Sequence, residues 1–279
     1  MKKLKTPTVD AKKLYINIQK NKDSEEYKET LENLQLRIFD RYIEYETNKK
    51  ELEKVNNSKI TDSERKCLLT CYSREGYIGR IITEEIYKIQ LPQHQHKCPY
   101  CYIGSPDTID HYIPKKQYPE FAILPINLIP CCSRCNGKKG ESWKENGKRL
   151  YINYYFDDIP KIKFLKATIC YDQRDVENTT KVKFTLINKS KIEPEVFDII
   201  KNQYNKLELL DKYCEIVDEE ISNLYSKIKD NSYIAIETHL DDLGREIRNL
   251  IKKYGINFWK VALYEEILES KFVQAIYLN

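Results

Sequence analysis

Four cysteines stand as two Cys-x-x-Cys pairs, Cys98/Cys101 and Cys132/Cys135. A two-residue gap lets both sulfurs of a pair turn onto one ion, and two pairs supply the four thiolates of a closed tetrahedral zinc site. We therefore predict one structural Zn²⁺. Ordinary buried thiols or a disulfide framework are alternatives, but the nine cysteines are an odd number and no signal-peptide pattern is visible. Cys131 could replace its neighbour as a ligand, although only Cys132 has the required spacing to Cys135.

The segment between the cysteine pairs carries Asp110, His111 and Asn127, and Asn136 follows the last cysteine directly. The runs TIDHYIP and INLIPCC contain strand-forming residues and prolines, so they predict an antiparallel hairpin joined by a long loop. A short helix is expected after Cys135. The predicted order is thus strand, loop, strand and helix, clamped at its base by the metal.

This order of elements and motif residues resembles the HNH endonuclease family, the zinc-ribbon branch of the ββα-metal nucleases. The resemblance implies that His111 is the general base that takes a proton from the attacking water. It also implies that the Asp110 carboxylate and the Asn136 side-chain oxygen are the ligands of a catalytic Mg²⁺ or Mn²⁺. Asn127 would hold the loop and the imidazole in place.

The implied chemistry suits these residue types. Hydrolysis of a phosphodiester needs a base such as histidine and a hard cation, which prefers oxygen ligands. Because neighbours on a strand point to opposite faces, Asp110 and His111 can serve one site only if the strand ends or twists there. The family's third position is often histidine, and Asn136 at that position leaves the metal preference open. The alternative is a ribbon that has lost its chemistry, with Asp110 as a turn residue and Asn136 as a helix cap.

Basic residues are concentrated around the motif. Residues 92–149 contain nine Lys and Arg against five Asp and Glu, an excess equal to the net charge of +4 of the whole chain. A solvated lysine face is the simpler interpretation, but phosphates would have to approach here. The expected phosphate contacts are Lys115, Lys116, Lys138 and Lys139.

The flanks predict helices and one further hairpin. Residues 24–56 show helical periodicity after a Ser24 cap, a second helix is expected from about Thr61, and a third ends before Pro92. His94 and His96 could be alternative metal ligands, but we expect a flexible, solvated lead-in.

Beyond the motif, apolar and polar residues alternate over 161–171 and 181–188, as in the two strands of a β-hairpin. Helices are expected over 194–229, 233–254 and 258–277. We therefore predict a mostly helical α+β protein with a central zinc-ribbon ββα-metal module. Its parts are an N-terminal helical region (1–91), the nuclease module (92–150), and a hairpin with C-terminal helices (151–279).

The stretch RLYINYYFDDIPKIKFL is similar to the segment that follows the nuclease motif in the HNH component of Septu-type bacterial defence systems. That resemblance implies an ATPase partner. We expect a cytoplasmic metal-dependent endonuclease acting on DNA by default, or on tRNA or another structured RNA. No apolar run reaches the roughly 20 residues of a membrane span. The second hypothesis is an inactive, zinc-stabilised module that binds nucleic acid or protein, and the third is a homodimer through the C-terminal helices.

Overall fold

The computed structural model describes residues 2–73, 76–189 and 191–278. Its internal contacts divide the chain into two compact units. The first unit is Lys3–Asp158, and the second holds Lys2 together with the chain from Ile159 onward. The described residues are mostly helical with small two-stranded sheets, which confirms the predicted α+β class. The expected N-terminal region and motif module lie within the same unit.

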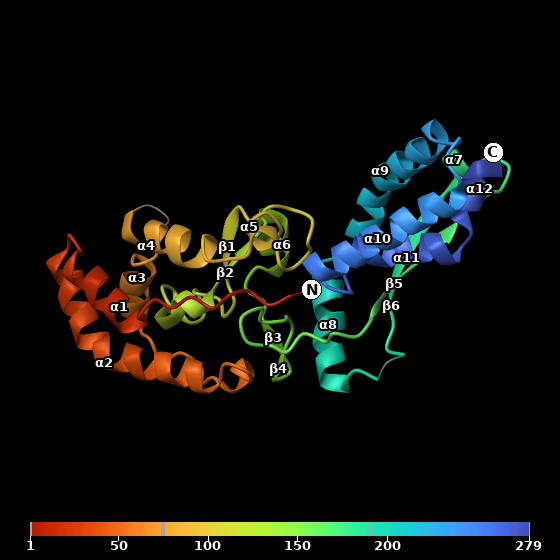
Figure 1. Cartoon of the computed structure of the whole chain (residues 1–279). Helices are drawn as coiled ribbons and strands as arrows, with labels where there is room; N and C mark the ends of the chain where they lie inside the picture. Colours follow the sequence, from red (N-terminus) through yellow and green to blue (C-terminus); the bar gives the residue numbers. More distant parts are fainter. Residues whose placement is uncertain (1, 74–75, 190, 279) are drawn as a thin grey trace. The chain divides into compact units, whose positions relative to one another are not determined.

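Within the described residues, the first unit contains ten helices or helical turns. Figure 1 labels the α-helices among them. The ten are α1 Ala11–Lys20, α2 Glu25–Thr47, η1 Leu52–Lys54, α3 Asp62–Leu69, α4 Gly76–Ile81, η2 Ile82–Tyr87, α5 Pro92–Gln95, η3 Pro119–Phe121, η4 Pro125–Asn127 and α6 Ser133–Lys139. The predicted starts are confirmed, because Ser24 caps α2 and Thr61 forms a capping box with Glu64. Helix α2 ends at Thr47, earlier than the predicted span to residue 56.

The predicted hairpin is present as β1 Thr108–His111 and β2 Leu128–Cys131. The strands are antiparallel, with Asp110 opposite Ile129 and His111 opposite Leu128. Helix α6 follows β2 and packs on β1, and its first amide, that of Ser133, donates to Asp107 at 2.7 Å. The strand ends at His111, which is the condition under which neighbouring residues can serve one site. Strands β3 Lys144–Glu145 and β4 Lys148–Arg149 form a second small hairpin.

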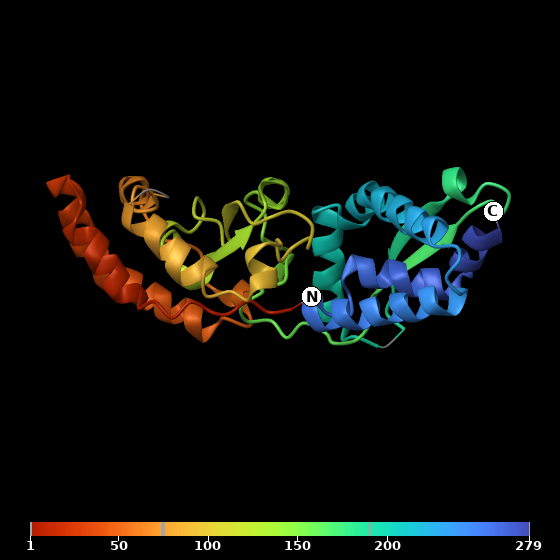
Figure 2. The ribbon, with the colours of Figure 1, turned by 45° about the horizontal axis from the view of Figure 1, so that its top comes forward.

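The second unit is built on a third hairpin, β5 Leu165–Cys170 and β6 Lys181–Leu186, as predicted. Helix α11 packs on β5 and α9 on β6, and the blue helices lie beside the green strands in Figure 2. The helices of this unit are α7 Val176–Thr179, α8 Pro194–Lys206, α9 Leu209–Asp230, α10 Ile236–Tyr254, α11 Trp259–Glu269 and α12 Phe272–Leu278.

Two helices expected to be continuous are broken in the second unit. The predicted helix over 194–229 divides into α8 and α9 where Glu208 adopts a φ of 50°. The predicted helix over 258–277 divides into α11 and α12 where Lys271 adopts a φ of 57°. A left-handed residue cannot continue a right-handed helix. Among the described helices, none combines the length and apolarity that a membrane span requires.

Candidate active site and metal centre

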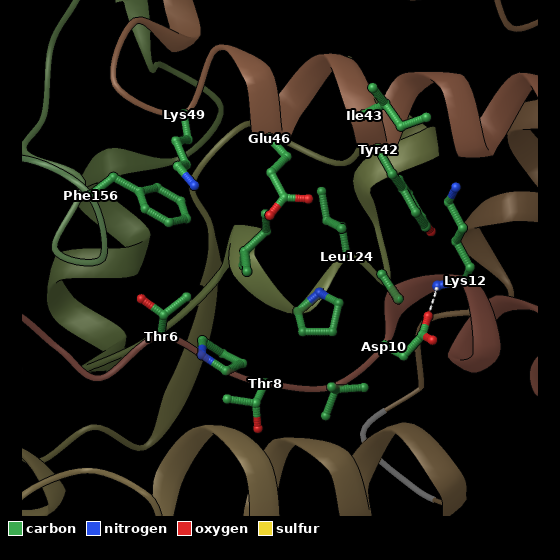
Figure 3. A pocket seen from close by; sticks show the side chains of 15 residues that line it. Thr6, Thr8, Asp10, Lys12, Tyr42, Ile43, Glu46, Lys49, Leu124 and Phe156 are labelled. Atoms are coloured by element: carbon green, nitrogen blue, oxygen red, sulfur yellow. Dashed lines mark hydrogen bonds between the residues drawn. The ribbon is translucent and has the colours of Figure 1, made fainter.

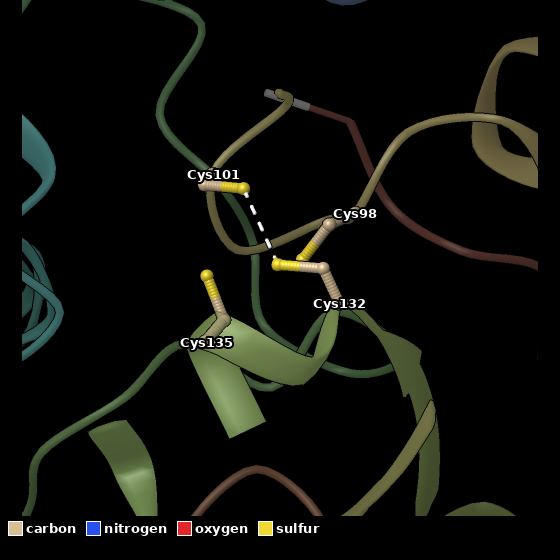
Figure 4. A group of neighbouring side chains, drawn as sticks. All are labelled: Cys98, Cys101, Cys132 and Cys135. Carbon is tan, nitrogen blue, oxygen red and sulfur yellow. Dashed lines mark hydrogen bonds between the residues drawn. The ribbon is translucent and has the colours of Figure 1, made fainter. Parts of the chain in front are cut away.

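The four cysteines of the two pairs converge on one point (Figure 4). Cys98 and Cys101 come from a loop, Cys132 directly precedes α6, and Cys135 lies within it. Their sulfurs all lie within 4.8 Å of one another, and the Cys101 and Cys132 sulfurs are 3.8 Å apart. Tetrahedral Zn–S bonds of about 2.3 Å place sulfurs ~3.8 Å apart, so the cluster has the size of a zinc site. The cluster fits a zinc-binding module.

The alternative ligands lie elsewhere. In the part of the chain that the structure describes, the four paired cysteines are the one group of clustered ligands. Cys131 pairs with Thr108 across the hairpin, and burial raises the pKa of its thiol. His94 is outside the cluster, yet it is not solvated as expected. It is 1 % exposed on α5, with its ring near that of Tyr102.

His111 is the last residue of β1, and its side chain is held by the loop between the strands. Its Nε2 lies 2.9 Å from the carbonyl oxygen of Ala122. A carbonyl can only accept, so Nε2 carries the ring proton and Nδ1 is left with the lone pair that a base needs. Burial, together with the nearby charges of Lys115 and Lys139, lowers the pKa of His111 to about 3, so the imidazole is neutral at pH 7.

An aromatic ring from the N-terminal helices borders this imidazole. Tyr72, just after α3, meets His111 edge to face with ring centroids 4.5 Å apart. The Lys115 ammonium lies 4.0 Å from the centroid of the same Tyr72 ring and so borders the same site. Such ring contacts restrict the imidazole to one orientation. Tyr72, which precedes the cysteine motif in the sequence, is therefore part of the site.

Asp110 is already engaged by the protein. Its Oδ1 accepts a hydrogen bond from the Lys139 ammonium at 2.9 Å, and its Oδ2 accepts one from the Tyr100 hydroxyl at 2.7 Å. The carboxylate is 2 % exposed. Lys139 therefore lies in the interior beneath the site, which differs from the surface phosphate contact expected from the sequence.

Asn136 lies on α6, facing β1. Its Nδ2 donates to the Thr108 hydroxyl and to the Ile109 carbonyl, both at 3.2 Å. These bonds fix the amide so that Oδ1, which has no hydrogen-bond donor among the described residues, is the atom available to a cation. An amide oxygen beside a carboxylate suits Mg²⁺ or Mn²⁺.

Asn127 is fully buried and holds the loop between the strands. Its Oδ1 accepts from the Ile113 amide at 2.8 Å, while its Nδ2 donates to the carbonyls of Ile113 and Phe121 at 3.0 and 3.2 Å. The Phe121 carbonyl precedes Ala122, whose own carbonyl holds His111. Asn127 thus affects the orientation of the His111 imidazole indirectly, by holding the loop that contains Ala122.

Helix α2 anchors the same loop from outside the motif. Arg41 donates to the buried carboxylate of Glu120 at 2.9 Å, and Tyr45 donates to Asn127 Oδ1 at 3.2 Å. Neither residue was predicted from the sequence to belong to the site. One signal was present: Glu120 is a single acid within the apolar run around PEFAIL, where a buried charge needs a partner.

The sequence-predicted catalytic groups share one cavity of about 330 Å³. Asp110, His111 and Asn136 line it together with Lys115 and Lys116. Asn127 is behind the loop and does not line it. Lys116 is exposed and pairs with Glu141 at 2.7 Å. The remaining predicted phosphate contact, Lys138, lies in the last turn of α6.

A larger cavity of about 570 Å³ is lined by the N-terminal segment, α2 and the loop before Asn127 (Figure 3). Tyr42 points into it, and its buried hydroxyl has no hydrogen-bond partner within the described residues. None of the sequence-predicted site residues and no histidine lines this cavity. Asp110, His111 and Asn136 thus gather at the smaller cavity and not at this one.

Comparisons with known proteins agree with this geometry. A protein-family model described as HNH endonuclease matches residues 98–142, so the chain carries an HNH endonuclease domain there. The chain is 41 % identical over 73 residues to Protein ea31 of Escherichia phage lambda, covering 25 % of each chain. It is 30 % identical over 104 residues to Septu protein PtuB of Bacillus thuringiensis, covering 36 % of this chain and 39 % of that one.

These alignments span a quarter and about two fifths of the two relatives' lengths. No solved structure matches the chain. What the comparisons support is the HNH endonuclease domain itself, at residues 98–142.

Proposed function

We propose that this chain, with its HNH endonuclease domain at residues 98–142, is a metal-dependent endonuclease in which His111 is the general base. One observation carries the proposal. The Ala122 carbonyl holds Nε2 of a neutral imidazole and leaves Nδ1 as the proton acceptor, in a cavity that Asp110 and Asn136 also line. A neutral, oriented imidazole can take the proton of the water that attacks the phosphorus.

The low pKa of His111 in the bare protein is compatible with this role. Burial and two lysines lower that pKa, and a phosphodiester in the cavity would bring negative charge beside the ring. An opposite charge at this distance favours the protonated imidazole and so raises the pKa towards the neutral range. His111 would then become a stronger base when substrate is bound.

Asp110 and Asn136 would hold Mg²⁺ or Mn²⁺, because both offer oxygen atoms to the same cavity. When bound, the cation supplies charge stabilisation to the phosphate and the leaving oxygen. The four cysteines would hold Zn²⁺, which fastens the base of the hairpin to α6 and takes no part in the chemistry.

The substrate is DNA by default, and tRNA or another structured RNA is the alternative. Lys115 and Lys116 would contact the phosphates at the cavity, and Lys138 would do so beside it. We further propose a role in bacterial defence, which the similarity to a Septu protein supports, together with an ATPase partner and a cytoplasmic location. Sequence preference would come from that partner, since the domain itself is small.

A second candidate is a zinc-stabilised binding module without activity. The observation in its favour is that both oxygens of Asp110 already accept hydrogen bonds from Lys139 and Tyr100. On this hypothesis nucleic acid or a partner protein would bind and not be cut.

Cleavage assays separate the two candidates. Purified protein is incubated with plasmid DNA and with total tRNA in Mg²⁺, Mn²⁺ or EDTA, alone and with the proteins encoded beside it. We expect metal-dependent products, and a loss of about 10²–10⁴ in rate for His111→Ala, because a general base contributes that much. Lys148→Ala, a change in an exposed lysine of β4 outside the cavity, is the control. Equal cleavage by His111→Ala would exclude the proposed base, and binding without cleavage under every condition would favour the binding module.

A further inference from the structure

Lys139 is a buried cation at the floor of the proposed active site. It is 1 % exposed in the last turn of α6. Its ammonium donates to Asp110 Oδ1 at 2.9 Å and to the His111 carbonyl at 3.1 Å. The rings of Tyr112 and Tyr151 lie 5.9 and 5.7 Å from it. A lysine is kept in an interior only when its charge is matched in this way.

The ion pair changes the charge that a metal would meet. Asp110 is the single acid among the two proposed metal ligands, and Lys139 cancels its charge. Asn136 is uncharged, Lys115 adds positive charge to the same cavity, and the remaining charged residues that line it, Lys116 and Glu141, pair with each other. A divalent cation gains most of its binding energy from negatively charged oxygens, and here the protein alone offers no net negative charge.

We propose that Lys139 is a positioning residue that holds Asp110 in a neutral pair, so that divalent-cation binding depends on a phosphate of the bound nucleic acid. The phosphate supplies the negative charge that the protein lacks, and cation and nucleic acid bind cooperatively. This rests on the proposed function, in that Asp110 and Asn136 are taken as the ligands of the cation.

The proposed coupling has a consequence for the free protein. Without nucleic acid, Mg²⁺ would be bound weakly, and the site would be inactive towards other phosphate esters that do not fill the cavity. Tyr100 supports the same arrangement, because its hydroxyl holds the second oxygen of Asp110 at 2.7 Å. If Lys139 served only to join α6 to β1, its loss would affect folding but would not change the coupling between cation binding and nucleic-acid binding.

Manganese binding tests this directly. Free Mn²⁺ is measured by electron paramagnetic resonance in titrations of the zinc-loaded full chain carrying His111→Ala, which prevents cleavage. Titrations are run alone, with a short DNA duplex and with tRNA. We expect the nucleic acid that the wild-type protein cleaves to tighten Mn²⁺ binding about tenfold or more, within the usual range of coupling between sites.

Removing the lysine charge should abolish the coupling. With Lys139→Met added, Mn²⁺ should bind about tenfold more tightly without nucleic acid, and nucleic acid should add little. Lys139→Gln keeps a donor for Asp110 and replaces the Met variant if that protein fails to fold, as judged by zinc content and circular dichroism. Lys148→Met is the matched control, because Lys148 is an exposed lysine of β4 that does not line the cavity, and it should leave the Mn²⁺ affinity of the free protein unchanged.

The outcomes distinguish this inference from the proposed function. Equal Mn²⁺ affinity with and without nucleic acid in the His111→Ala protein would overturn the coupling, while cleavage by the wild type would keep the nuclease. The same Mn²⁺ affinity in folded Lys139 variants and their parent would also overturn it. If Mn²⁺ bound in none of the titrations and the wild type cleaved nothing, both the coupling and the proposed nuclease function would be overturned.

Discussion

The two ends of the β1–β2–α6 module satisfy their polar groups in different ways. At one end, four buried cysteines have their sulfurs within 4.8 Å of one another, a cluster of ligands that could hold one metal ion. At the other end, Asp110, Asn127 and Asn136 already have partners in the protein. On the proposed function, zinc completes the first end, whereas the second end is complete as a fold and would need a metal only for chemistry.

This difference separates stability from activity within one small domain. A structural metal contributes its binding energy to folding, while a catalytic cation that binds with substrate does not. Changes at the cysteine end should therefore act on the fold and on zinc content together. Changes at the cavity end should alter stability only through lost hydrogen bonds, and zinc should stay bound.

The largest effect is expected from Cys135→Ser. Losing a thiolate should release the metal and with it about 10 kcal/mol of binding energy, since structural zinc supplies folding energy of that order. Zinc content and circular dichroism measure the loss. Cys214→Ser, a change in the partly exposed cysteine of α9, is the matched control and should keep both zinc and fold. A folded Cys135→Ser protein with a full zinc complement would contradict the assignment of the cluster.

An intermediate effect is expected from Asn127→Ala. The change leaves the Ile113 amide and the carbonyls of Ile113 and Phe121 without their buried partner, at a cost of about 3 kcal/mol. Chemical denaturation gives the free energy of unfolding, and zinc analysis should show the metal retained. Tyr45→Phe removes one hydroxyl donor, which Asn127 Oδ1 and the Ile126 carbonyl share, and should cost about 1 kcal/mol. Loss of zinc from folded Asn127→Ala would show that the two ends are not independent.

The smallest effect is expected from Lys116→Ala. This side chain is 71 % exposed, and its surface pair with Glu141 contributes little to stability. If Lys116 contacts a phosphate, the slope of log binding constant against log salt should fall by about 1, as measured by fluorescence anisotropy. An unchanged slope would remove Lys116 from the nucleic-acid contacts.

Much of the first unit follows from local signals. The cysteine spacing predicted the cluster, the apolar runs between prolines predicted β1 and β2, and the Ser24 and Thr61 caps predicted where helices begin. Each signal lies within a few residues of the structure it determines. The breaks at Glu208 and Lys271 were missed because neither is a glycine, and neither is marked by a nearby proline.

The partners of the candidate site could not be predicted in the same way. Lys139 meets Asp110 across 29 positions in the sequence, and Arg41 meets Glu120 across 79. A lysine beside another lysine after the last cysteine looks like a solvated surface group until the fold encloses it. His94 was misjudged for the same reason, since burial depends on what packs above a residue and not on its neighbours in sequence.

The ring contact between Tyr72 and His111 limits how the nuclease domain can be transplanted. A grafted fragment beginning at residue 92 would keep the cysteines and the hairpin, but its imidazole would lose the ring that borders it. It would also lose the Arg41 and Tyr45 side chains that fasten the loop. The portable unit of this protein is therefore the whole of Lys3–Asp158, and a host scaffold would have to accept α1 to α4 along with the motif.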